Sequence, residues 1–439
     1  MRRLLRILLP KSLKWRVHGM LAWIAAVRFG FPAQHLTVVA VTGTNGKTTV
    51  VSYIGQLLRA TGHPVGWIST ATICINDKET LNATKLTTPS PTVLQATLAR
   101  MVRAGCQYAV LEASSEGLVQ GRLNGIDPEV AVFTNLTPEH IESHGSFEAY
   151  AKAKEILFVK LASARRRGRR TRIVINVDDP AAGRYLRYPA SEKVGCSLGL
   201  PRVRESEDFH LLVAANIADT ATGSSFQIDG VDVHTPFVGR FNVMNVLEAI
   251  TTVKLLGVPV ADVALAAEKL TAVPGRMEFL DDLHLSFRIL VDYAPEPASL
   301  HALYTVLPRF GARRIIHVFG SAGGGRDRAR RPILGKFVTE HADVAIITNE
   351  DPYDEDPKRI LNDISIGTEQ ASPHKAKVEI ILDRREALTR ALTLAQEGDL
   401  VVVTGKACEQ WLMGPRGQRT PWDDRTVLRE IARSIPKKG

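Results

Sequence analysis

The chain has 439 residues, of which 45% are hydrophobic and 23% charged. These proportions are ordinary for a globular enzyme, and the length indicates two or three domains. The net charge of +10 suits a nucleic acid, a membrane surface or an anionic substrate. The four cysteines stand alone at 74, 106, 196 and 408, so neither a zinc ribbon nor a disulfide framework is indicated, and a reducing, cytoplasmic setting fits. No apolar run reaches the ~18 residues that a spanning helix needs.

Residues 1–35 mix basic and apolar side chains, with arginines at 2, 3, 6 and 16 and a proline at 10. A secretory signal is disfavoured, because the apolar stretch is short and no clear cleavage site follows it. Two interpretations stay open. One, which we prefer, is a helix packed on the next domain with its bases in solvent; the other is an interfacial helix on anionic lipid.

A strand, a glycine turn and a helix follow. The apolar run at 36–41 predicts a strand, and residues 50–58 carry apolar side chains at helical spacing. Between them lie Gly43, Thr44, Asn45, Gly46, Lys47, Thr48 and Thr49. The spacing Gly-x-x-Gly-Lys-Thr is a shortened phosphate-binding loop, whose glycines let amides and the helix start face an anion. Lys47 would reach the β- and γ-phosphates, and the Thr48 hydroxyl would hold Mg²⁺; a plain glycine turn is the less favoured alternative.

Strands and helices alternate up to about residue 160. Strands are expected at 65–69, 108–112 and 130–134, and helices at 92–104 and 147–160. Shorter strands and a helix near 245–256 continue the pattern over 173–272. This alternation predicts an α/β fold with a mainly parallel sheet and helices on both faces.

A second α/β unit begins after the proline and glycine at 274 and 275. Its expected strands are 287–291, 315–319, 344–348, 378–382 and 400–404, and its expected helices are 298–306, 333–339 and 385–395. We therefore predict an N-terminal segment at 1–35, a central ATP-binding domain at 36–273 and a C-terminal Rossmann-like domain at 274–439. The basic run at 165–172 is interpreted as a solvated loop in preference to a nucleic-acid site.

Several polar residues of the central domain are candidates for chemistry. Glu112 ends a predicted strand, where α/β proteins bind ligands, although a surface turn is an equal alternative. His140 suits a divalent metal only as a minority ligand among oxygens, and a lone histidine is more often structural. Lys154 has apolar neighbours in its helix, which by itself favours a snorkelling lysine.

Hydroxyl and amide side chains offer further candidates. Thr87 and Thr88 precede a helix, which they would cap unless they bind a substrate. Asn242 and Asn245 lie three apart on one predicted helix face, where amides either read an adenine edge or cap the helix.

These motifs stand in the order found in the Mur ligases, which the chain resembles from about residue 36 to 439. The likeness is closest to the MurE type, which adds the third residue of the peptidoglycan stem peptide. It rests on residues 42–49, 87–89, 112–115, 133–136, 140, 144–145, 154, 239–245, 274–278, 292–294 and 405–406. So many motifs in one order are far more specific than any one of them.

The resemblance implies an ATP-dependent acid–amino-acid ligase with ATP and Mg²⁺ as cofactors. ATP would convert a carboxylate into an acyl phosphate, which an amine then attacks. The loop at 43–49 would hold the phosphates, and Asn245, Arg276 and Asp292 would contact adenine, phosphate and ribose. The implied metal ligands are Thr48, Glu112, His140 and a carbamylated Lys154, and the implied catalytic residues are Lys47, Glu112, His140 and Lys154. The implied substrate contacts are Thr87, Thr88, Ser114, Arg122, Asp351, Tyr353, Gly405 and Glu409.

The sequence also departs from the MurE pattern. In a MurE ligase, a domain of about one hundred residues that binds the uridine nucleotide normally precedes the loop. Here only residues 1–35 precede the strand before the loop, so this way of binding the nucleotide is missing or replaced. The family's Glu-Val-Ser-Ser-His, Asp-Tyr-Ala-His and Gly-Lys-Gly-His-Glu each lose a histidine, at 116, 295 and 408. Diaminopimelate-adding members carry an arginine where Tyr353 stands. This arginine makes a bidentate contact with the distal carboxylate of the amino acid, which a tyrosine cannot make. Asp351 and Asp354 would instead favour an amine-bearing amino acid such as lysine.

The first hypothesis is therefore a MurE-like ligase acting on a peptidoglycan-precursor peptide. A second is a polyglutamate- or cyanophycin-type ligase with an acceptor that carries no uridine nucleotide, and a third is a nucleotide-binding relative without turnover. The intact Lys47, Thr48, Glu112, His140 and Lys154 argue against the third. The expected partners are a nucleotide-sugar peptide or related acid and an amino acid, with no nucleic acid. We expect a monomer, with membrane contact only through residues 1–35.

Overall fold

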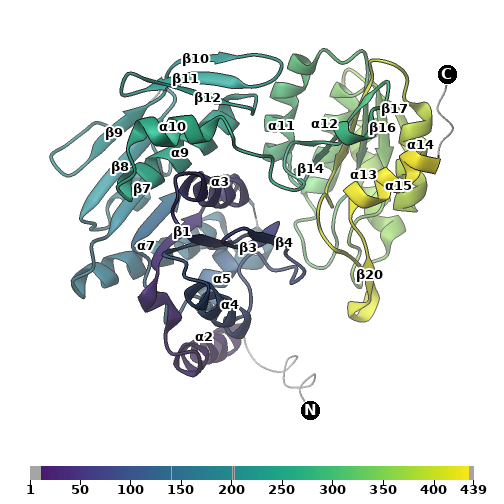
Figure 1. Cartoon of the computed structure of the whole chain (residues 1–439). Helices are drawn as coiled ribbons and strands as arrows, with labels where there is room; N and C mark the ends of the chain where they lie inside the picture. The colour runs from purple at the N-terminus through teal and green to yellow at the C-terminus, as the bar shows by residue number, and fades with distance from the viewer. Residues whose placement is uncertain (1–10, 140, 200, 202, 435–439) are drawn as a thin grey trace. The chain divides into compact units, whose positions relative to one another are not determined.

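The computed structural model describes residues 11–139, 141–199, 201 and 203–434 (Figure 1). Its contacts divide the chain into two compact units. Unit 1 comprises residues 1–137 and 147–271, and unit 2 comprises residues 138–146 and 272–439. Both are α/β folds with mainly parallel sheets, which confirms the predicted fold class. In the described part of the chain, no helix combines the length and apolar character needed to cross a bilayer.

Unit 1 is built on a nine-stranded sheet in the order β4-β3-β2-β5-β1-β6-β7-β8-β9. The strands are β1 (Thr37–Thr42), β2 (Val65–Ile68), β3 (Thr72–Ile75), β4 (Lys78–Leu81), β5 (Tyr108–Glu112), β6 (Val130–Phe133), β7 (Arg172–Asn176), β8 (Glu192–Ser197) and β9 (His210–Val213). The first strand, β1, lies at the centre, parallel to both β5 and β6. The antiparallel pairs of this sheet are β2 with β3 and β3 with β4. Because both faces of the central strands are covered, their sequences are almost continuously apolar.

Helices cover this sheet. They are α2 (Lys11–Arg28), η1 (Pro32–His35), α3 (Lys47–Ala60), α4 (Pro91–Arg103), α5 (Ser115–Val119), α7 (Phe147–Arg166), α8 (Ala182–Leu186), α9 (Arg240–Leu255) and α10 (Val260–Ala267). Val38 and Ala40 of β1 join one core cluster with apolar residues of α4 and α7, and α3 and α9 contact the sheet as well. A separate antiparallel sheet of β10 (Ala215–Asp219), β11 (Ser224–Ile228) and β12 (Val231–Thr235) replaces the parallel continuation expected there.

The basic run at 165–172 is partly neutralised at the surface. Arg167 pairs with Asp127 at 2.5 Å, Arg169 with Glu129 at 3.1 Å, and Arg170 with Glu192 at 3.4 Å. Such surface pairs contribute little to stability, but they reduce the positive field that a nucleic-acid site requires. The run therefore has the character of the surface loop that the sequence favours.

Unit 2 has a six-stranded sheet in the order β13-β14-β18-β15-β16-β17, parallel except for β13. The strands are β13 (Glu278–Phe279), β14 (Arg288–Asp292), β15 (Ile315–Phe319), β16 (Val344–Ile347), β17 (Lys377–Ile380) and β18 (Leu400–Thr404), with a hairpin of β19 (Trp411–Met413) and β20 (Arg419–Pro421). The helices are α6 (Ile141–His144), α11 (Pro297–Val306), α12 (Arg330–His341), α13 (Pro357–Glu369), α14 (Arg384–Leu394) and α15 (Asp424–Ser434), with 3₁₀ turns η2 (Asp281–Leu283), η3 (Leu307–Phe310) and η4 (Pro415–Gly417).

Successive side chains of β14 enter different cores, because strand residues alternate between the two faces of a sheet. Ile289 and Val291 pack with α14 and α15, whereas Leu290 packs with α11, α12 and α13. The predicted arrangement of helices on both faces is therefore confirmed in unit 2. Helix α13 is not among the helices expected from the sequence. Its start is nevertheless recognisable, because Asp356 caps it and Pro357 occupies its first turn.

Two glycines let α12 and α13 pack with their backbones in contact. A Cβ on Gly335 would lie 2.0 Å from the carbonyl oxygen of Ile364, and a Cβ on Gly367 would lie 1.8 Å from that of Pro332. Since a carbonyl oxygen cannot move aside as a flexible side chain can, both positions require glycine.

We predict that Gly367→Ala destabilises the protein by about 1–3 kcal/mol, because the added methyl forces the two helices apart. Urea denaturation measures the free energy of unfolding. The matched control is Gly183→Ala in α8, where no heavy atom lies within 4 Å of an added Cβ. This control should keep or slightly raise stability, since alanine is the better helix former. A Gly367→Ala protein as stable as the control would contradict the prediction.

Candidate functional site

The turn between β1 and α3 has the backbone of an anion-binding loop. Gly43 has φ of 151° and Gly46, at the N-cap of α3, has φ of 81°. A Cβ on Gly43 would lie 1.9 Å from Thr134 Oγ1, and one on Gly46 would lie 2.5 Å from Asn245 Oδ1. The loop is thus closely enclosed, and any helix start offers amide hydrogens that have no partner within the helix. It has the shape and polarity to cradle a phosphate group.

The segment after β6 holds this loop in place. The Thr134 hydroxyl donates to the carbonyl oxygen of Asn45 at 2.6 Å. Asn135 receives the Asn45 amide on Oδ1 at 2.9 Å and the Thr44 amide on its backbone oxygen at 2.8 Å. The Lys47 ammonium folds back and donates to the carbonyl oxygen of Thr44 at 2.7 Å. Because β6 is the parallel neighbour of β1, sheet pairing itself brings these segments together.

The Glu112 carboxylate is buried beside the loop, which excludes the surface-turn alternative. The register of β1 and β5 places Glu112 opposite Val41. Its Oε2 accepts hydrogen bonds from Thr48 Oγ1 at 3.0 Å, from the Thr70 amide at 2.7 Å and from Thr70 Oγ1 at 2.9 Å. The side chain is only 3% exposed, so these donors compensate the cost of removing a carboxylate from water.

Lys154 is fully buried on α7, so the snorkelling interpretation is wrong. Its ammonium donates to the carbonyl oxygen of Gly43 at 2.5 Å and lies 4.2 Å from the ring centroid of Tyr150. The Tyr150 hydroxyl in turn donates to Thr44 Oγ1 at 3.2 Å. Helix α7 therefore supports the glycine loop through two side chains one turn apart.

The side-chain atoms around the loop that could bind a metal are hydroxyl and carboxylate oxygens, the ligands that Mg²⁺ prefers. Thr48 and Glu112 supply one such pair. Among the described residues, no group of three or more histidine, cysteine, aspartate or glutamate side chains is gathered as a metal site. His140, the remaining predicted ligand, lies outside the described residues. The oxygens of Thr48 and Glu112 fit a magnesium ion.

The predicted substrate residues near α4 and α5 form one hydrogen-bonded group. The Thr88 hydroxyl donates to the backbone oxygen of Glu112 at 2.8 Å and accepts from the Ser114 amide at 3.0 Å. The Ser114 hydroxyl caps α5, and Arg122 donates to the Thr88 carbonyl. Thr87 accepts from Thr70 at 3.0 Å. Thr88 thus links the segment before α4 to the end of β5. It does not cap α4, which begins at Pro91 with Ser90 at its N-cap and no side-chain cap.

The two asparagines on α9 have different surroundings. Asn242 donates to the Val238 carbonyl at 2.9 Å, a local bond at the helix start, whereas Asn245 points to Gly46 of the loop. One turn beyond lies Glu248, which the sequence analysis missed. It is fully buried, and neither carboxylate oxygen has a hydrogen-bond partner among the described residues. Burial and, second, the charge of Asp179 raise its pKa well above the usual range, so the carboxyl is held neutral.

In unit 2, Arg276 and Asp292 lie in one polar cluster. The Arg276 guanidinium stacks 4.3 Å from the ring centroid of Tyr293. The Asp292 carboxylate accepts from the amides of Met277 at 2.7 Å and Ala294 at 2.9 Å. Burial raises the pKa of Asp292, and the nearby Arg276 charge opposes that rise.

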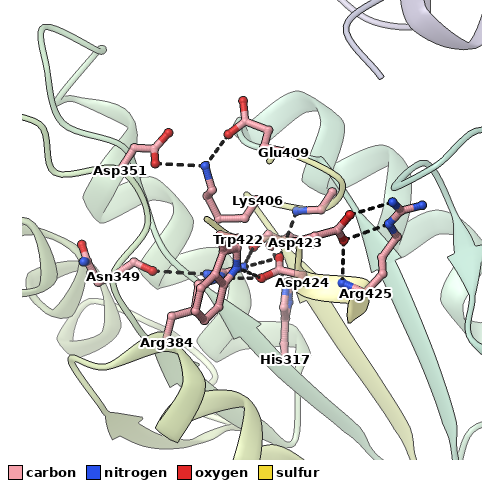
Figure 2. A network of polar contacts seen from close by, with 12 residues as sticks. His317, Asn349, Asp351, Arg384, Lys406, Glu409, Trp422, Asp423, Asp424 and Arg425 are labelled. Atoms are coloured by element: carbon pink, nitrogen blue, oxygen red, sulfur yellow. Dashed lines mark hydrogen bonds and ion pairs between the residues drawn. The ribbon is translucent and has the colours of Figure 1, made fainter. Parts of the chain in front are cut away.

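A second polar cluster of unit 2 surrounds Lys406, which is fully buried (Figure 2). Its ammonium donates to Asp351 Oδ1 at 2.9 Å, to Glu409 and to the carbonyl oxygen of Trp411 at 2.8 Å. Asp351 also accepts from the Met413 amide at 2.8 Å, and Asp354 accepts from the Arg416 amide. Both predicted selectivity carboxylates therefore already have partners within the unit.

The remaining predicted residues of unit 2 lie around this cluster. Gly405, with φ of 102°, leaves room for Glu350, since an added Cβ would lie 2.8 Å from the Glu350 Cδ. Tyr353 has φ of 53° and donates its amide to Met413 at 3.1 Å.

An ion pair that the sequence analysis missed supports the same end of the unit 2 sheet. Arg384 makes a bidentate contact with Asp424 at 2.8 and 2.7 Å and also donates to the Thr404 carbonyl (Figure 2). The two side chains are 1% and 0% exposed. Their signal in the sequence is weak, because 40 residues separate them.

Fold and site together define a two-unit α/β protein with a glycine-rich anion loop in its first unit. The family model for the Mur ligase middle domain matches residues 41–253, and that for the Mur ligase glutamate ligase domain matches residues 275–407. A relative from Geobacillus kaustophilus (strain HTA426), named UDP-N-acetylmuramoyl-L-alanyl-D-glutamate--2,6-diaminopimelate ligase, is 39% identical over 93% of this chain and 81% of its own. A Parabacteroides distasonis relative of the same name is 35% identical over 92% and 79%. The chain therefore belongs to the Mur ligase family and is an ATP-dependent ligase that forms C–N bonds.

Two solved structures with similar folds support this assignment to the family and the fold. One, described as a structure of UDP-N-acetylmuramoyl-L-alanyl-D-glutamate--2,6-diaminopimelate ligase, matches with a TM-score of 0.59 and 30% identity over 97% of this chain and 84% of its own. Folylpolyglutamate synthase of Mycobacterium tuberculosis matches with a TM-score of 0.69 at 18% identity, covering 94% of each chain. The second likeness shows a shared fold alone.

We predict that Gly43→Ala lowers the affinity for ATP by about 10- to 100-fold, because making room for the methyl costs about 1–3 kcal/mol. Titration with a fluorescent ATP analogue measures this affinity. The control is Gly62→Ala beyond the other end of α3, where φ is 82° and no atom lies within 4 Å of an added Cβ. Its affinity should match that of the wild type. Equal affinities for both variants would show that the loop geometry is unimportant.

A second prediction concerns Glu248. The unfolded chain releases this proton near the usual glutamate pKa of about 4.3, whereas the folded chain retains it, so folding stability falls as pH rises above that value. Glu248→Gln should therefore flatten the dependence of the unfolding free energy on pH by up to about 1.4 kcal/mol per pH unit. Urea denaturation at a series of pH values from about 5 to about 8 measures this dependence. Glu248→Met, which also has no carboxyl group to titrate, should show an equally weak dependence of the unfolding free energy on pH. If both variants keep the wild-type dependence, the buried neutral carboxyl is refuted.

Proposed function

We propose that the chain joins an amino acid to the carboxylate of a peptidoglycan-precursor peptide through an acyl phosphate. The observation that carries the proposal is the contact of the Thr48 hydroxyl with the buried Glu112 carboxylate, directly beside a glycine loop that has no room for a Cβ. The names of the relatives support the choice of substrate class, since these proteins are named as ligases of an amino acid to a UDP-N-acetylmuramoyl dipeptide.

The residues of unit 1 divide the work of phosphoryl transfer. The loop amides and the start of α3 would orient the phosphates, and Lys47 would leave its contact with Thr44 to offset their charge. Thr48 and Glu112 would hold Mg²⁺, which when bound neutralises phosphate charge. Asn245, beside Gly46, would contact the base, and Thr88, Ser114 and Arg122 would position the acceptor.

Lys154 is proposed to act as a carbamate. In carbamylation the deprotonated amine adds CO₂ and loses one further proton, which gives an anion that keeps one N–H, so the contact with the Gly43 carbonyl can persist. The change supplies a further oxygen ligand next to the loop, where a cation would repel the metal. His140 is proposed as a companion ligand. For unit 2, we propose that Arg276 and Asp292 contact phosphate and ribose, and that Tyr353, Gly405 and Glu409 line the amino-acid site.

We predict that Lys154→Ala and Lys154→Arg each lower ligase turnover by about 10²-fold or more, because neither side chain can form a carbamate. ADP release under saturating substrates measures turnover. Lys152→Ala, on the same helix with its side chain 68% exposed, is the control and should keep wild-type turnover. An active Lys154→Arg enzyme would show that a cation is enough and would reject the carbamate.

The amino acid is proposed to carry an amine on its side chain. Tyr353 cannot make the bidentate contact of an arginine with a distal carboxylate. Asp351 already accepts a hydrogen bond from Lys406, so it does not by itself select an amine on the substrate. This contact argues against the expected direct role of Asp351 in binding a lysine side chain. The cluster contains the two carboxylates of Asp351 and Glu409 and the one ammonium of Lys406, so negative charge is in excess. It therefore disfavours an amino acid with a second carboxylate.

A panel of amino acids and acceptors tests the reaction. We expect ADP release to require both an acceptor and an amino acid, and turnover to be faster with lysine than with diaminopimelate. Mass spectrometry identifies the product. Equal or faster turnover with diaminopimelate would reject the proposed amino acid but keep the ligase. Turnover with free peptide or polyglutamate acceptors, and none with uridine-nucleotide acceptors, would instead support the polyglutamate- or cyanophycin-type alternative.

A further inference from the structure

The outward face of α2 presents large apolar side chains to solvent. Met20 is 58% exposed, Trp23 52% and Val27 64%. The full set is Val17, Met20, Leu21, Trp23, Ile24 and Val27. A helix repeats every 3.6 residues, so these positions lie on one broad face. Isolated exposed apolar residues need no explanation, but six on one helix form a contiguous apolar surface, which we call the α2 apolar face.

The opposite face of α2 accounts for its packing on unit 1. Ala22, Ala25 and Ala26 are buried, and α2 contacts α4 (Figure 1). A Cβ on Gly125 would lie 2.5 Å from the Cβ of Ala26, so helix and turn approach closely. Asn124 donates to the Gly19 carbonyl at 3.3 Å. The small residues of this face make the close packing of the helix on unit 1.

The charge of this part of the chain indicates what covers the α2 apolar face. Residues 1–28 contain seven bases and no acid: Arg2, Arg3, Arg6, Lys11, Lys14, Arg16 and Arg28. The first acidic residue of the chain is Asp77. A segment that combines an apolar helix face with seven bases and no acid in its sequence matches an anionic lipid surface. A second copy of the chain is a poorer occupant, because it would bring together two segments with the same positive charge.

We propose that α2 is an interfacial helix, which seats its apolar face in the headgroup region of an anionic bilayer and leaves unit 1 on the surface. The packed helix is observed, and the proposal adds the interfacial helix for the other face of the same segment. The helix would lie along the membrane and not cross it. The proposal is independent of the ligase reaction, since lipid binding requires no turnover.

Co-sedimentation of the full chain with vesicles tests the proposal. We expect binding to phosphatidylcholine vesicles that contain phosphatidylglycerol, little binding to phosphatidylcholine alone, and loss of binding at high salt. Trp23 fluorescence should shift to shorter wavelength on binding, and Trp23→Phe should remove that shift. Equal binding to both kinds of vesicle, or to neither, would overturn the proposal.

Paired variants separate the apolar face from general surface effects. Met20→Glu with Ile24→Glu should reduce partitioning by about ten-fold or more, because it places two carboxylates at the lipid contact. Leu265→Glu on α10, where the leucine is 61% exposed, is the control and should bind as the wild type does. Thermal unfolding should be unchanged in both, since these side chains are exposed. If the double variant instead abolishes a concentration-dependent dimer seen by light scattering, and the vesicles do not bind, the face is a self-interface and the membrane proposal fails.

Discussion

The hydrogen bond from the Thr48 hydroxyl to the Glu112 carboxylate is the contact on which the candidate site depends. It joins the start of α3 to the end of β5, two elements that become neighbours only because β5 pairs beside β1 in the parallel sheet. The tight loop at Gly43 and Gly46 then sets the distance between helix and strand. A site formed this way is rigid, since each ligand-binding group stands on a regular element whose position is fixed by sheet pairing.

Buried charges in both units follow one physical rule. Lys154, Lys406 and Arg384 are removed from water, and each makes hydrogen bonds to oxygen atoms that compensate that cost. Glu248 has no such partner among the described residues, and burial raises its pKa so that the neutral form is favoured. The compensated groups surround the candidate loop and the candidate amino-acid site, where a fixed charge is useful. Glu248 lies one turn from Asn245, within the core that supports the loop.

The two faces of α2 differ in their surroundings. Its alanine face packs closely on unit 1, whereas its apolar face is exposed and is the surface that we propose lies in the membrane. Sequence composition by itself presented these as alternatives, because a count of basic and apolar residues does not say which side of a helix is covered. The distribution of small and large residues around the helix makes the two compatible.

Local patterns were enough to determine much of this protein. The apolar run before Gly43, the glycine spacing and the order of motifs predicted the loop, the α/β class and the family, because strand, turn and helix signals depend on neighbouring residues. Asp356 and Pro357 carried an equally local helix signal that was overlooked. Only the tertiary structure decided the contacts between residues far apart in the chain, such as Lys154 with Gly43 and Arg384 with Asp424. It also decided the burial of Glu248 at a place where no described residue hydrogen-bonds its carboxyl group. Burial and partners depend on which strands pair and which helices cover them, and no short stretch of sequence contains that information.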